Sequence, residues 1–278
     1  MYFKEFQKYK IVHIKESEDI YKIASDSFVY VDTSLLIKSK YTISNKKNIV
    51  LIGNNHALVL EKNTTLKFEK CTNIKLENLC FESLGTPDAN GEISLQFCNC
   101  QNVEITGCTF IDCEDEQLAI KHKSNNFYLE HCKFILTKNE YHSFAVLIGY
   151  QKNDFPKDGK FNIIFYQCYF NGGQGRYPRC RNCILFMLNC IWDSECSKYL
   201  IGAENSYVFI DTCFIECNTK NIFGDFDNYN YFLKDTYVNP ENDCFLLKQR
   251  KICVPDFTYS TVNKDELLKI LKIKRRQD

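Results

Sequence analysis

The chain has 278 residues, enough for one large domain or two ordinary ones with a sizeable buried core. Its 35 Lys and Arg residues balance its 35 Asp and Glu residues, so the overall charge indicates neither a nucleic-acid nor a membrane partner. No run approaches the roughly 18 apolar residues of a membrane span, and the charged start of the chain lacks the apolar centre of a secretory signal.

The first predicted element is a short helix over residues 17–24, where a serine N-cap precedes residues at helical spacing. Strands follow closely and are rich in β-branched and aromatic residues, with Asn, Lys and Gly turns between them. They are predicted over residues 35–39, 49–52, 57–60, 65–68, 74–76 and 94–97. No helix separates these strands, which excludes doubly wound α/β folds and leaves a sandwich or a solenoid.

A cysteine followed by an aromatic or large apolar residue recurs along the chain and decides between these two folds. The steps between successive cysteines are 28, 24, 36, 22 and 23 residues, for Cys80, Cys108, Cys132, Cys168, Cys190 and Cys213. Three short strands with their turns need about 22 to 25 residues. We therefore predict an all-β chain, a single-stranded parallel β-helix with one interior cysteine per coil and short helices capping its termini.

The 16 cysteines are interpreted as buried thiols, because the chain shows no export signal. We expect a cytoplasmic or other reducing location, while an extracellular or virion-associated one, with disulfides, stays open. A bias toward Lys, Asn, Ile and Phe suggests an AT-rich genome, such as that of a large DNA virus or a protist.

The rest of the chain completes this organisation. An Asn precedes several strands and suits a tight turn, because it tolerates left-handed backbone and its amide can bond the neighbouring turn. Residues 137–161 lengthen one coil as a surface loop, and an amphipathic helix is predicted over 264–274. The predicted domains are a lead-in and cap at 1–34, the β-helix with lateral loops at 35–262, and the C-terminal helix at 263–278.

Several segments between residues 49 and 259 carry a resemblance to the pectate lyase family, and four of them show it best. Asn102–Phe110 sits where the family has Asn-Val-Trp-Ile-Asp-His-Cys-Ser-Phe, and Asp115–Ile120 resembles its Asp-Gly-Leu-x-Asp-Ile stretch. Ala145–Gly149 resembles its Met-Leu-Ile-Gly segment, and Arg176–Arg181 matches Arg-x-Pro-x-x-Arg, the most specific of these motifs. Their shared order along nearly the whole chain implies a right-handed parallel β-helix with the active groove on one lateral face.

The resemblance implies β-elimination on polygalacturonate, in which an arginine base removes the proton next to a carboxylate and Ca²⁺ neutralises that carboxylate. Arg176 would be the base, and Arg181 the second catalytic residue, which binds substrate or braces the site. Arg179 and Pro178 would lie at the substrate-binding surface, where Pro178 fixes the backbone. An acidic polysaccharide is then the expected partner, and self-association is a further possibility.

Calcium would be held by Asp115 and Glu92, but this part of the family pattern is incomplete. Ala119 stands where the family has a second Asp. Glu114 and Glu116 could compensate only if their side chains turn outward.

Two further departures lie among the supporting groups, where Phe144 replaces the family's helper lysine and Phe186 its histidine. The arginines are kept while the supporting groups are lost, so two functions stay open. One is a lyase of weak or absent activity, and the other is a repurposed β-helix that binds carbohydrate or serves as a structural or assembly component.

A third hypothesis is a glycoside hydrolase on the same architecture, which needs paired carboxylates about 5 to 10 Å apart. Its candidates are Asp112 with Asp115, or Asp193 with Glu195.

Overall fold

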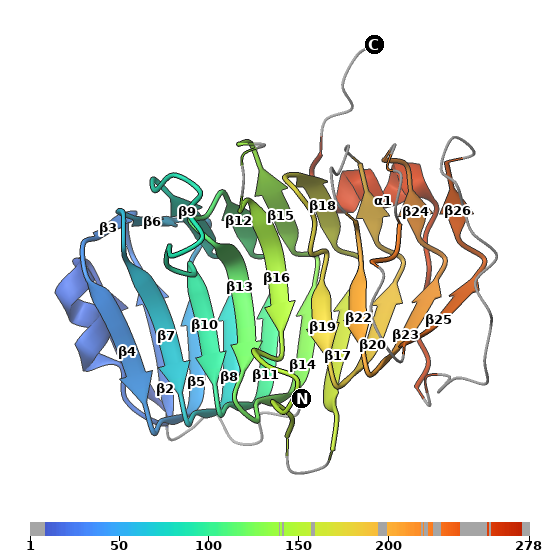
Figure 1. Ribbon diagram of the computed structural model, residues 1–278. Coiled ribbons are helices and arrows are strands. Elements are labelled where there is room, and N and C mark those ends of the chain that lie inside the picture. The colour runs from blue at the N-terminus through green and yellow to red at the C-terminus, as the bar shows by residue number, and fades with distance from the viewer. Residues whose placement is uncertain are drawn as a thin grey trace.

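The computed structural model describes residues 9–273 except for 139, 141, 157–158, 194–198, 218, 220–221, 225–228, 240–254 and 256. Its strands run parallel in three sheets, the ten-stranded sheet A, the nine-stranded sheet B and the seven-stranded sheet C (Figure 1). Each complete coil gives one strand to each sheet, in the order C, A, B. The chain is a right-handed parallel β-helix, as predicted.

The strands follow one another across each sheet at intervals of one coil. Sheet A contains β1 (Lys10–Ile14), β2 (Ser27–Val31), β5 (Lys47–Ile52), β8 (Thr72–Glu77), β11 (Gln101–Thr106), β14 (Asn125–Glu130), β17 (Phe161–Tyr166), β20 (Cys183–Leu188), β23 (Ser206–Asp211) and β25 (Tyr229–Lys234). Sheet B contains β3 (Leu35–Ile37), β6 (Ala57–Leu60), β9 (Cys80–Ser83), β12 (Thr109–Ile111), β15 (Lys133–Leu136), β18 (Tyr169–Gly172), β21 (Ile191–Trp192), β24 (Phe214–Ile215) and β26 (Tyr237–Val238). Sheet C contains β4 (Lys40–Ser44), β7 (Thr65–Glu69), β10 (Leu95–Cys98), β13 (Glu116–Lys121), β16 (Phe144–Ile148), β19 (Arg179–Arg181) and β22 (Gly202–Glu204). Because β1 and β2 already belong to sheet A, the β-helix starts before the predicted boundary at residue 35.

The interior is built from side chains at alternate strand positions, each stacked on its equivalent one coil away. On sheet B this stack is aromatic, with successive ring centroids 5.1, 4.8, 5.2 and 5.4 Å apart and nearly parallel ring planes. It consists of Phe81, Phe110, Phe134, Phe170 and Trp192, which are all fully buried. The strand register places each ring directly on the next, so one coil adds one ring to a continuous core.

The cysteine ladder lies two residues before the aromatic stack, where the chain turns from sheet A to sheet B. Cys108, Cys132, Cys168, Cys190 and Cys213 are fully buried, and none of them forms a disulfide. Burial raises the pKa of the Cys108, Cys168 and Cys213 thiols well above its usual value, so these groups are neutral parts of the core. The prediction of one interior cysteine per coil is confirmed for these five coils.

The prediction for Cys80 is wrong by one residue. Cys80 pairs with Thr109 in sheet B and is half-buried, so Leu79 fills the ladder position in that coil. The reason is that Cys80 directly precedes Phe81, whereas the other ladder cysteines precede their aromatic or apolar partner by two residues. Side chains alternate along a strand, and adjacent residues therefore cannot both face the interior.

Asparagine side chains form a second ladder where the chain turns from sheet C to sheet A. The amide of Asn48 donates to the Asp26 carboxylate at 2.6 Å, and that of Asn73 donates to the Asn48 oxygen at 2.9 Å. Asn102 donates to Asn73 and Asn126 to Asn102, each at 3.1 Å. All five residues have φ between 55° and 59°, a left-handed conformation that Asn and Asp tolerate best after glycine. The predicted role of Asn in the tight turns is confirmed at these positions.

We expect Asn102→Ala to lower the free energy of unfolding by about 1–2 kcal/mol. The change breaks two ladder hydrogen bonds, and it places alanine at a positive φ without the polar side chain that lets asparagine tolerate it. Urea denaturation followed by circular dichroism would measure the change. Asn102→Gly serves as the control, since glycine accepts this φ and loses only the hydrogen bonds. An alanine variant as stable as the parent would contradict this account of the ladder.

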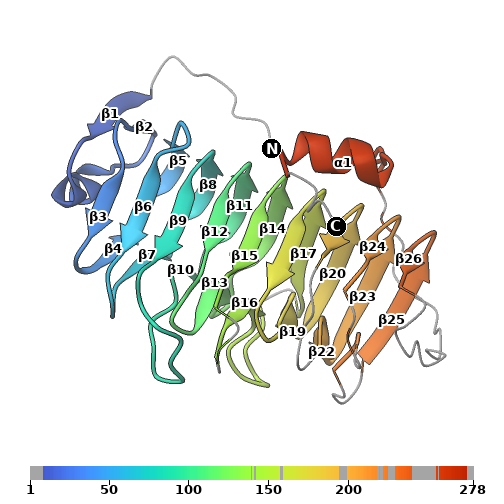
Figure 2. The ribbon, with the colours of Figure 1, turned by 90° about the horizontal axis from the view of Figure 1, so that it is seen from above.

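A short helix covers the N-terminal end of the coil, as predicted (Figures 1 and 2). It is the 3-10 helix η2 (Ser17–Lys22), which contacts β1, β3 and β4. Ile20 and Ile23 are buried there against the first coil. No helix in the described part of the chain is long and apolar enough to cross a membrane.

The C-terminal helix α1 (Lys264–Ile270) lies along the side of the coil, on the outer face of sheet B (Figure 2). Leu267 and Leu268 are buried against Tyr169 of β18. Ile270, near the end of the same helix, is 38% exposed. The helix therefore shields a lateral face.

The segment before α1, residues 257–262, crosses the outer face of sheet A and is called the C-terminal strap below. The Phe257 ring meets the Phe186 ring edge-on at a centroid distance of 5.8 Å. The Tyr166 hydroxyl donates to the main-chain oxygen of Ser260 at 2.7 Å. The strap thus covers the strands of sheet A from β17 onward.

Candidate functional site

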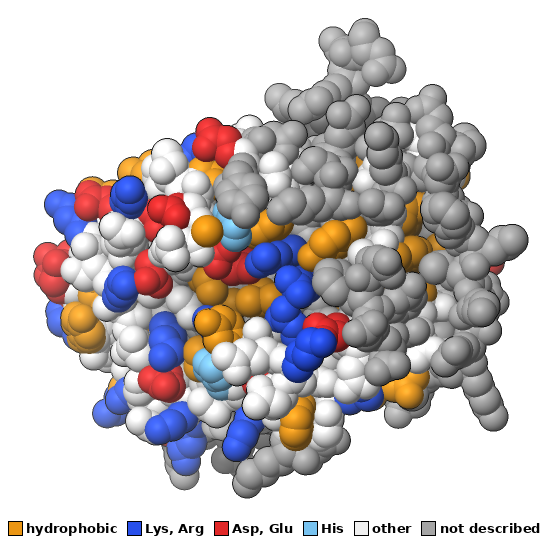
Figure 3. Space-filling view, in the orientation of Figure 1, with side chains coloured by type: hydrophobic (Ala, Val, Ile, Leu, Met, Phe, Trp, Pro, Cys, Tyr) orange, Lys and Arg blue, Asp and Glu red, His pale blue; other side chains and the backbone are white. Residues whose placement is uncertain are grey.

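The predicted lateral face is the outer surface of sheet C, called the sheet C face below. Ile93, Ala119 and Leu147 form a small apolar cluster at its centre. Figure 3 shows hydrophobic side chains there, with Lys and Arg side chains directly beside them. The arginine motif reaches this face because β19 is the sheet C strand of its coil.

Arg176 lies just before β19 with φ of 60° and forms an ion pair with Glu116 of β13. Its guanidinium also covers the ring of Phe144, with Cζ 3.7 Å from the ring centre. The side chains of Arg176 and Glu116 are only 16% and 1% exposed. The predicted base is therefore held between a buried carboxylate and an aromatic ring, and the residue that replaces the helper lysine is part of this arrangement.

The two acidic residues next to Arg176 are coupled to each other. Burial and the neighbouring Asp115 carboxylate raise the pKa of Glu116 to about 8, although Arg176 acts in the opposite direction. Burial raises the pKa of Asp115 as well. Arg176 is the positive group that lies against this buried acidic pair.

Arg181 is fixed by an acid and by main-chain carbonyls. Its Nε donates to Glu204 Oε2 at 3.1 Å, and its Nη1 donates to the oxygens of Gly149 and Tyr150 at 2.9 and 3.1 Å. Lys152 makes a second ion pair with Glu204 at 3.1 Å. Arg181 thus holds the start of the loop after β16 in place.

Arg179 points outward from β19 beside Leu147, its partner in the sheet C register. Burial lowers the pKa of Arg179, and the positive charges of Arg181 and Arg176 lower it further. Three guanidinium groups therefore lie in one coil of this face, and two of them are paired with Glu116 and Glu204. Pro178 is buried, and its carbonyl accepts a hydrogen bond from the Gly202 N–H in the next coil.

An exposed tyrosine stands beside the arginines on a well-fixed loop. Tyr150 is 51% exposed, and Lys121 lies 5.4 Å from its ring centre. The nearly buried Asp154 carboxylate accepts main-chain N–H groups from Tyr150, His122 and Lys123 at 2.8 to 3.3 Å. Sequence reasoning missed both Tyr150 and Asp154, because only the folded loop brings them to the arginine motif.

The residues predicted to hold calcium do not fit a calcium site. Asp115 faces His142, with Oδ1 3.4 Å from Nδ1. Glu92 instead forms an ion pair with Lys40 of β4. Ala119 belongs to the apolar cluster. Among the residues that the structure describes, no three His, Cys, Asp or Glu side chains are grouped to hold a metal ion. Six to eight oxygen ligands, the usual Ca²⁺ shell, are not supplied by this set.

The two glutamates considered as substitutes have other partners. Glu116 does turn outward, but toward Arg176. Glu114 is 2% exposed and accepts main-chain N–H groups from Asn63 at 2.8 Å and Glu92 at 2.9 Å. Glu114 therefore fixes neighbouring turns and does not complete a cation shell.

The remaining candidates lie away from the arginine cluster or serve the fold. Phe186 packs on the outer face of sheet A with Phe209, so the lost histidine position is not on the sheet C face. Asp112 accepts hydrogen bonds from the main chain and hydroxyl of Thr137, both at 2.7 Å. Asp193 accepts one from the Tyr169 hydroxyl at 2.7 Å. Glu195 lies outside the described residues.

No family model and no curated protein sequence matches the chain. Its fold is similar to solved structures of pectate lyases and related proteins. A pectate lyase from Bacillus sp. N165 in complex with trigalacturonate has a TM-score of 0.72 at 14% identity, covering 96% of this chain and 93% of that one. Jun a 1, the major allergen from cedar pollen, has 0.74 at 13% identity, with 96% and 88% covered. Pectate lyase C from Erwinia chrysanthemi, at pH 9.5 with 30 mM Ca²⁺, has 0.64 at 13% identity, with 97% and 92% covered. The chain therefore has the pectate-lyase-like parallel β-helix fold that the motifs implied.

Proposed function

We propose that the sheet C face binds an acidic polysaccharide of the polygalacturonate type and does not cleave it by β-elimination. Guanidinium groups pair with carboxylates through charge-assisted hydrogen bonds, and Arg179 lies on this face between two further arginines. The fold similarity to a pectate lyase in complex with trigalacturonate supports this choice of ligand.

The ion pair between Arg176 and Glu116 is the observation that argues against cleavage. An arginine base must give up its proton before it can remove the proton next to the sugar carboxylate. Deprotonation of Arg176 would leave the negative charge on the buried Asp115 and Glu116 pair without its counter-charge. The ring of Phe144 further favours the cationic form.

An elimination must neutralise the sugar carboxylate, and the described residues of this face are not arranged to hold a metal ion that would do so. Arg179 and Arg181 can hold such a carboxylate in the ground state. Binding to them orients the sugar, and it leaves the proton next to the carboxylate in place.

Binding and product formation, measured side by side, test the proposal. We expect calorimetry to detect trigalacturonate and polygalacturonate binding by the wild type, weakened by added salt because the contacts are ionic. Absorbance of unsaturated product should stay at the buffer level from neutral to alkaline pH, with and without Ca²⁺. Arg176→Ala and the less disruptive Arg176→Lys should give the same background trace.

Two outcomes would overturn the proposal. Unsaturated product that forms with the wild type and is lost in both Arg176 variants would establish a lyase. A wild-type protein that binds neither ligand at low salt would remove the acidic polysaccharide as partner.

A further inference from the structure

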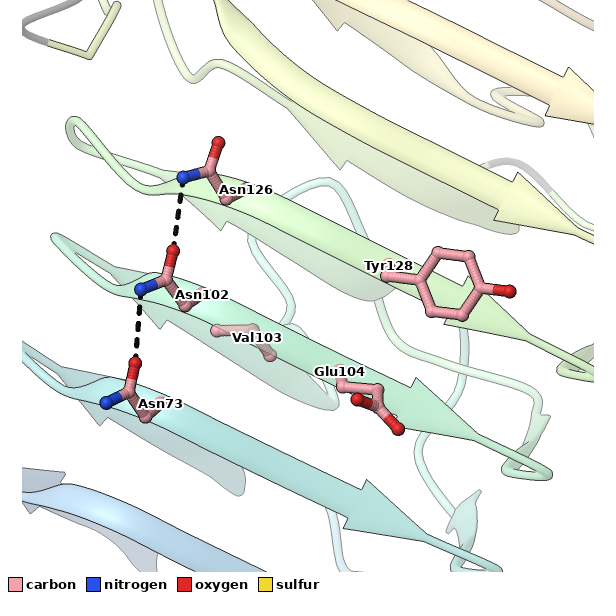
Figure 4. Close-up of a pocket in the computed structure, with 6 residues that line it drawn as sticks. All are labelled: Asn73, Asn102, Val103, Glu104, Asn126 and Tyr128. Carbon is pink, nitrogen blue, oxygen red and sulfur yellow. Dashed lines mark hydrogen bonds between the residues drawn. The ribbon is translucent and has the colours of Figure 1, made fainter. Parts of the chain in front are cut away.

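The outer face of sheet A carries a shallow pocket of about 310 Å³ that is separate from the arginine cluster. Its lining residues come from β8, β11 and β14 (Figure 4), whereas the described contacts of the C-terminal strap with sheet A begin at β17. They are Asn73, Asn102, Val103, Glu104, Asn126 and Tyr128.

The asparagine ladder supplies one side of this pocket and keeps hydrogen-bonding capacity for a ligand. A primary amide has two N–H donors and an oxygen that accepts two hydrogen bonds. Asn102 uses one donor toward Asn73 and one acceptor site toward Asn126, and it retains one of each. Asn126 is exposed, and its oxygen accepts no hydrogen bond from any described residue. Figure 4 shows the three amides in one row, with the Asn126 oxygen at its end.

Tyr128 supplies the other side. Its ring is half-buried and stands on the same strand two residues after Asn126 (Figure 4). Burial and the nearby Glu130 carboxylate raise the pKa of Tyr128, so its hydroxyl is a neutral donor and acceptor at physiological pH. An aromatic ring beside a row of amides combines a flat apolar contact with hydrogen bonds.

The charge around the pocket excludes the ligand proposed for the sheet C face. Lys75 pairs with Glu77 at 3.1 Å and with Glu104 at 3.2 Å. Glu130 lies close enough to Tyr128 to raise its pKa, so among these described residues three carboxylates accompany one ammonium group. A polyanion would be repelled here, and an uncharged ligand with many hydroxyl groups would not.

We propose that this pocket binds an uncharged β-1,4-linked glycan that lies across β8, β11 and β14, along the axis of the coil. Neighbouring parallel strands are about 4.8 Å apart, so the three amides repeat at a spacing close to one sugar residue of an extended chain. Each amide pairs with a sugar hydroxyl, and the ring of Tyr128 stacks on the apolar face of one sugar. This site is independent of the function proposed for the sheet C face.

Cellohexaose is the probe, and the wild type and four variants are compared by NMR titration and calorimetry. The wild type should show saturable binding, with chemical-shift changes confined to β8, β11 and β14. Tyr128→Ala should weaken binding about tenfold or more, which equals about 1.4 kcal/mol. Asn126→Gly should weaken it about two- to tenfold, since glycine keeps φ of 59° and removes the amide. Asn54→Gly is the matched control, because Asn54 is also exposed at positive φ but lies at another turn.

The proposal is overturned if the wild type shows no saturable binding of cellohexaose, or if Asn126→Gly and Tyr128→Ala bind it as the wild type does. Asn126→Gly keeps the test decisive even if Tyr128→Ala does not fold. Trigalacturonate should not compete with cellohexaose, and Arg179→Ala should bind cellohexaose unchanged. Competition, or a loss in Arg179→Ala, would place the glycan on the sheet C face and refute a second site.

Discussion

Phe134→Ala is expected to lower the free energy of unfolding by about 3–5 kcal/mol, the usual cost of removing a buried aromatic ring. The Phe134 ring is fully buried and lies 4.8 Å from the Phe110 ring and 5.2 Å from the Phe170 ring, nearly parallel to both. Its loss opens a cavity in the middle of the aromatic stack, and a coil cannot collapse without shifting its neighbours. Equilibrium unfolding in urea measures the change.

Phe134→Leu is the matched control for this prediction. Leucine keeps most of the buried apolar volume and loses the ring, so the variant should fall clearly between the wild type and Phe134→Ala. A loss below about 1 kcal/mol in the alanine variant would mean that the stack does not carry the stability of the coil. A small loss would also be measured if the solenoid unfolded coil by coil. In that case the unfolding transitions followed by different spectroscopic probes would not coincide.

Arg179→Ala is expected to weaken polygalacturonate binding by about ten- to a hundredfold. Hydrogen bonds to charged groups are worth about 1.5–3 kcal/mol, and about 1.4 kcal/mol corresponds to tenfold in affinity. Arg179 points outward beside Leu147 on the sheet C face, and circular dichroism of the variant checks that the fold is kept. Calorimetry at low salt measures the affinity.

Lys10→Ala removes one positive charge from an exposed position on β1, at the N-terminal end of sheet A, and serves as the control. It should bind as the wild type does, because a distant exposed charge is largely screened. Arg179→Lys should recover only part of the affinity, since lysine keeps the charge but not the forked donor geometry. Equal losses in Lys10→Ala and Arg179→Ala would indicate attraction by overall charge and contradict a defined site.

Most of the fold could be predicted from local sequence patterns. The spacing of Cys108, Cys132, Cys168, Cys190 and Cys213, each two residues before an aromatic or apolar side chain, determined both the coil length and the inward face of sheet B. Inward and outward positions alternate along every strand, so this information is contained in neighbouring residues. The same rule explains the error at Cys80, because no residue separates this cysteine from the aromatic residue Phe81.

The location of the C-terminal helix could not be read from its sequence. Its apolar side predicted a helix that packs on something, and Leu267 and Leu268 do pack. The partner is Tyr169, nearly a hundred residues earlier in the chain, on an outer face that the strand pattern alone would leave to solvent. An amphipathic pattern specifies which side is buried and does not specify the surface that buries it.

The sequence by itself determined the parallel β-helix, the interior cysteines, the asparagine turns and the presence of an arginine motif on one lateral face. Only the tertiary structure decided what those arginines contact. Arg176 meets Glu116 from sixty residues earlier, and Arg181 meets Glu204 from the following coil. Such pairs depend on the register of coils whose lengths differ, and on which side chains compensate a buried charge. No single motif encodes this register or this choice of compensating side chains. Together they make Arg176, the predicted base, the ion-pair partner of a buried carboxylate.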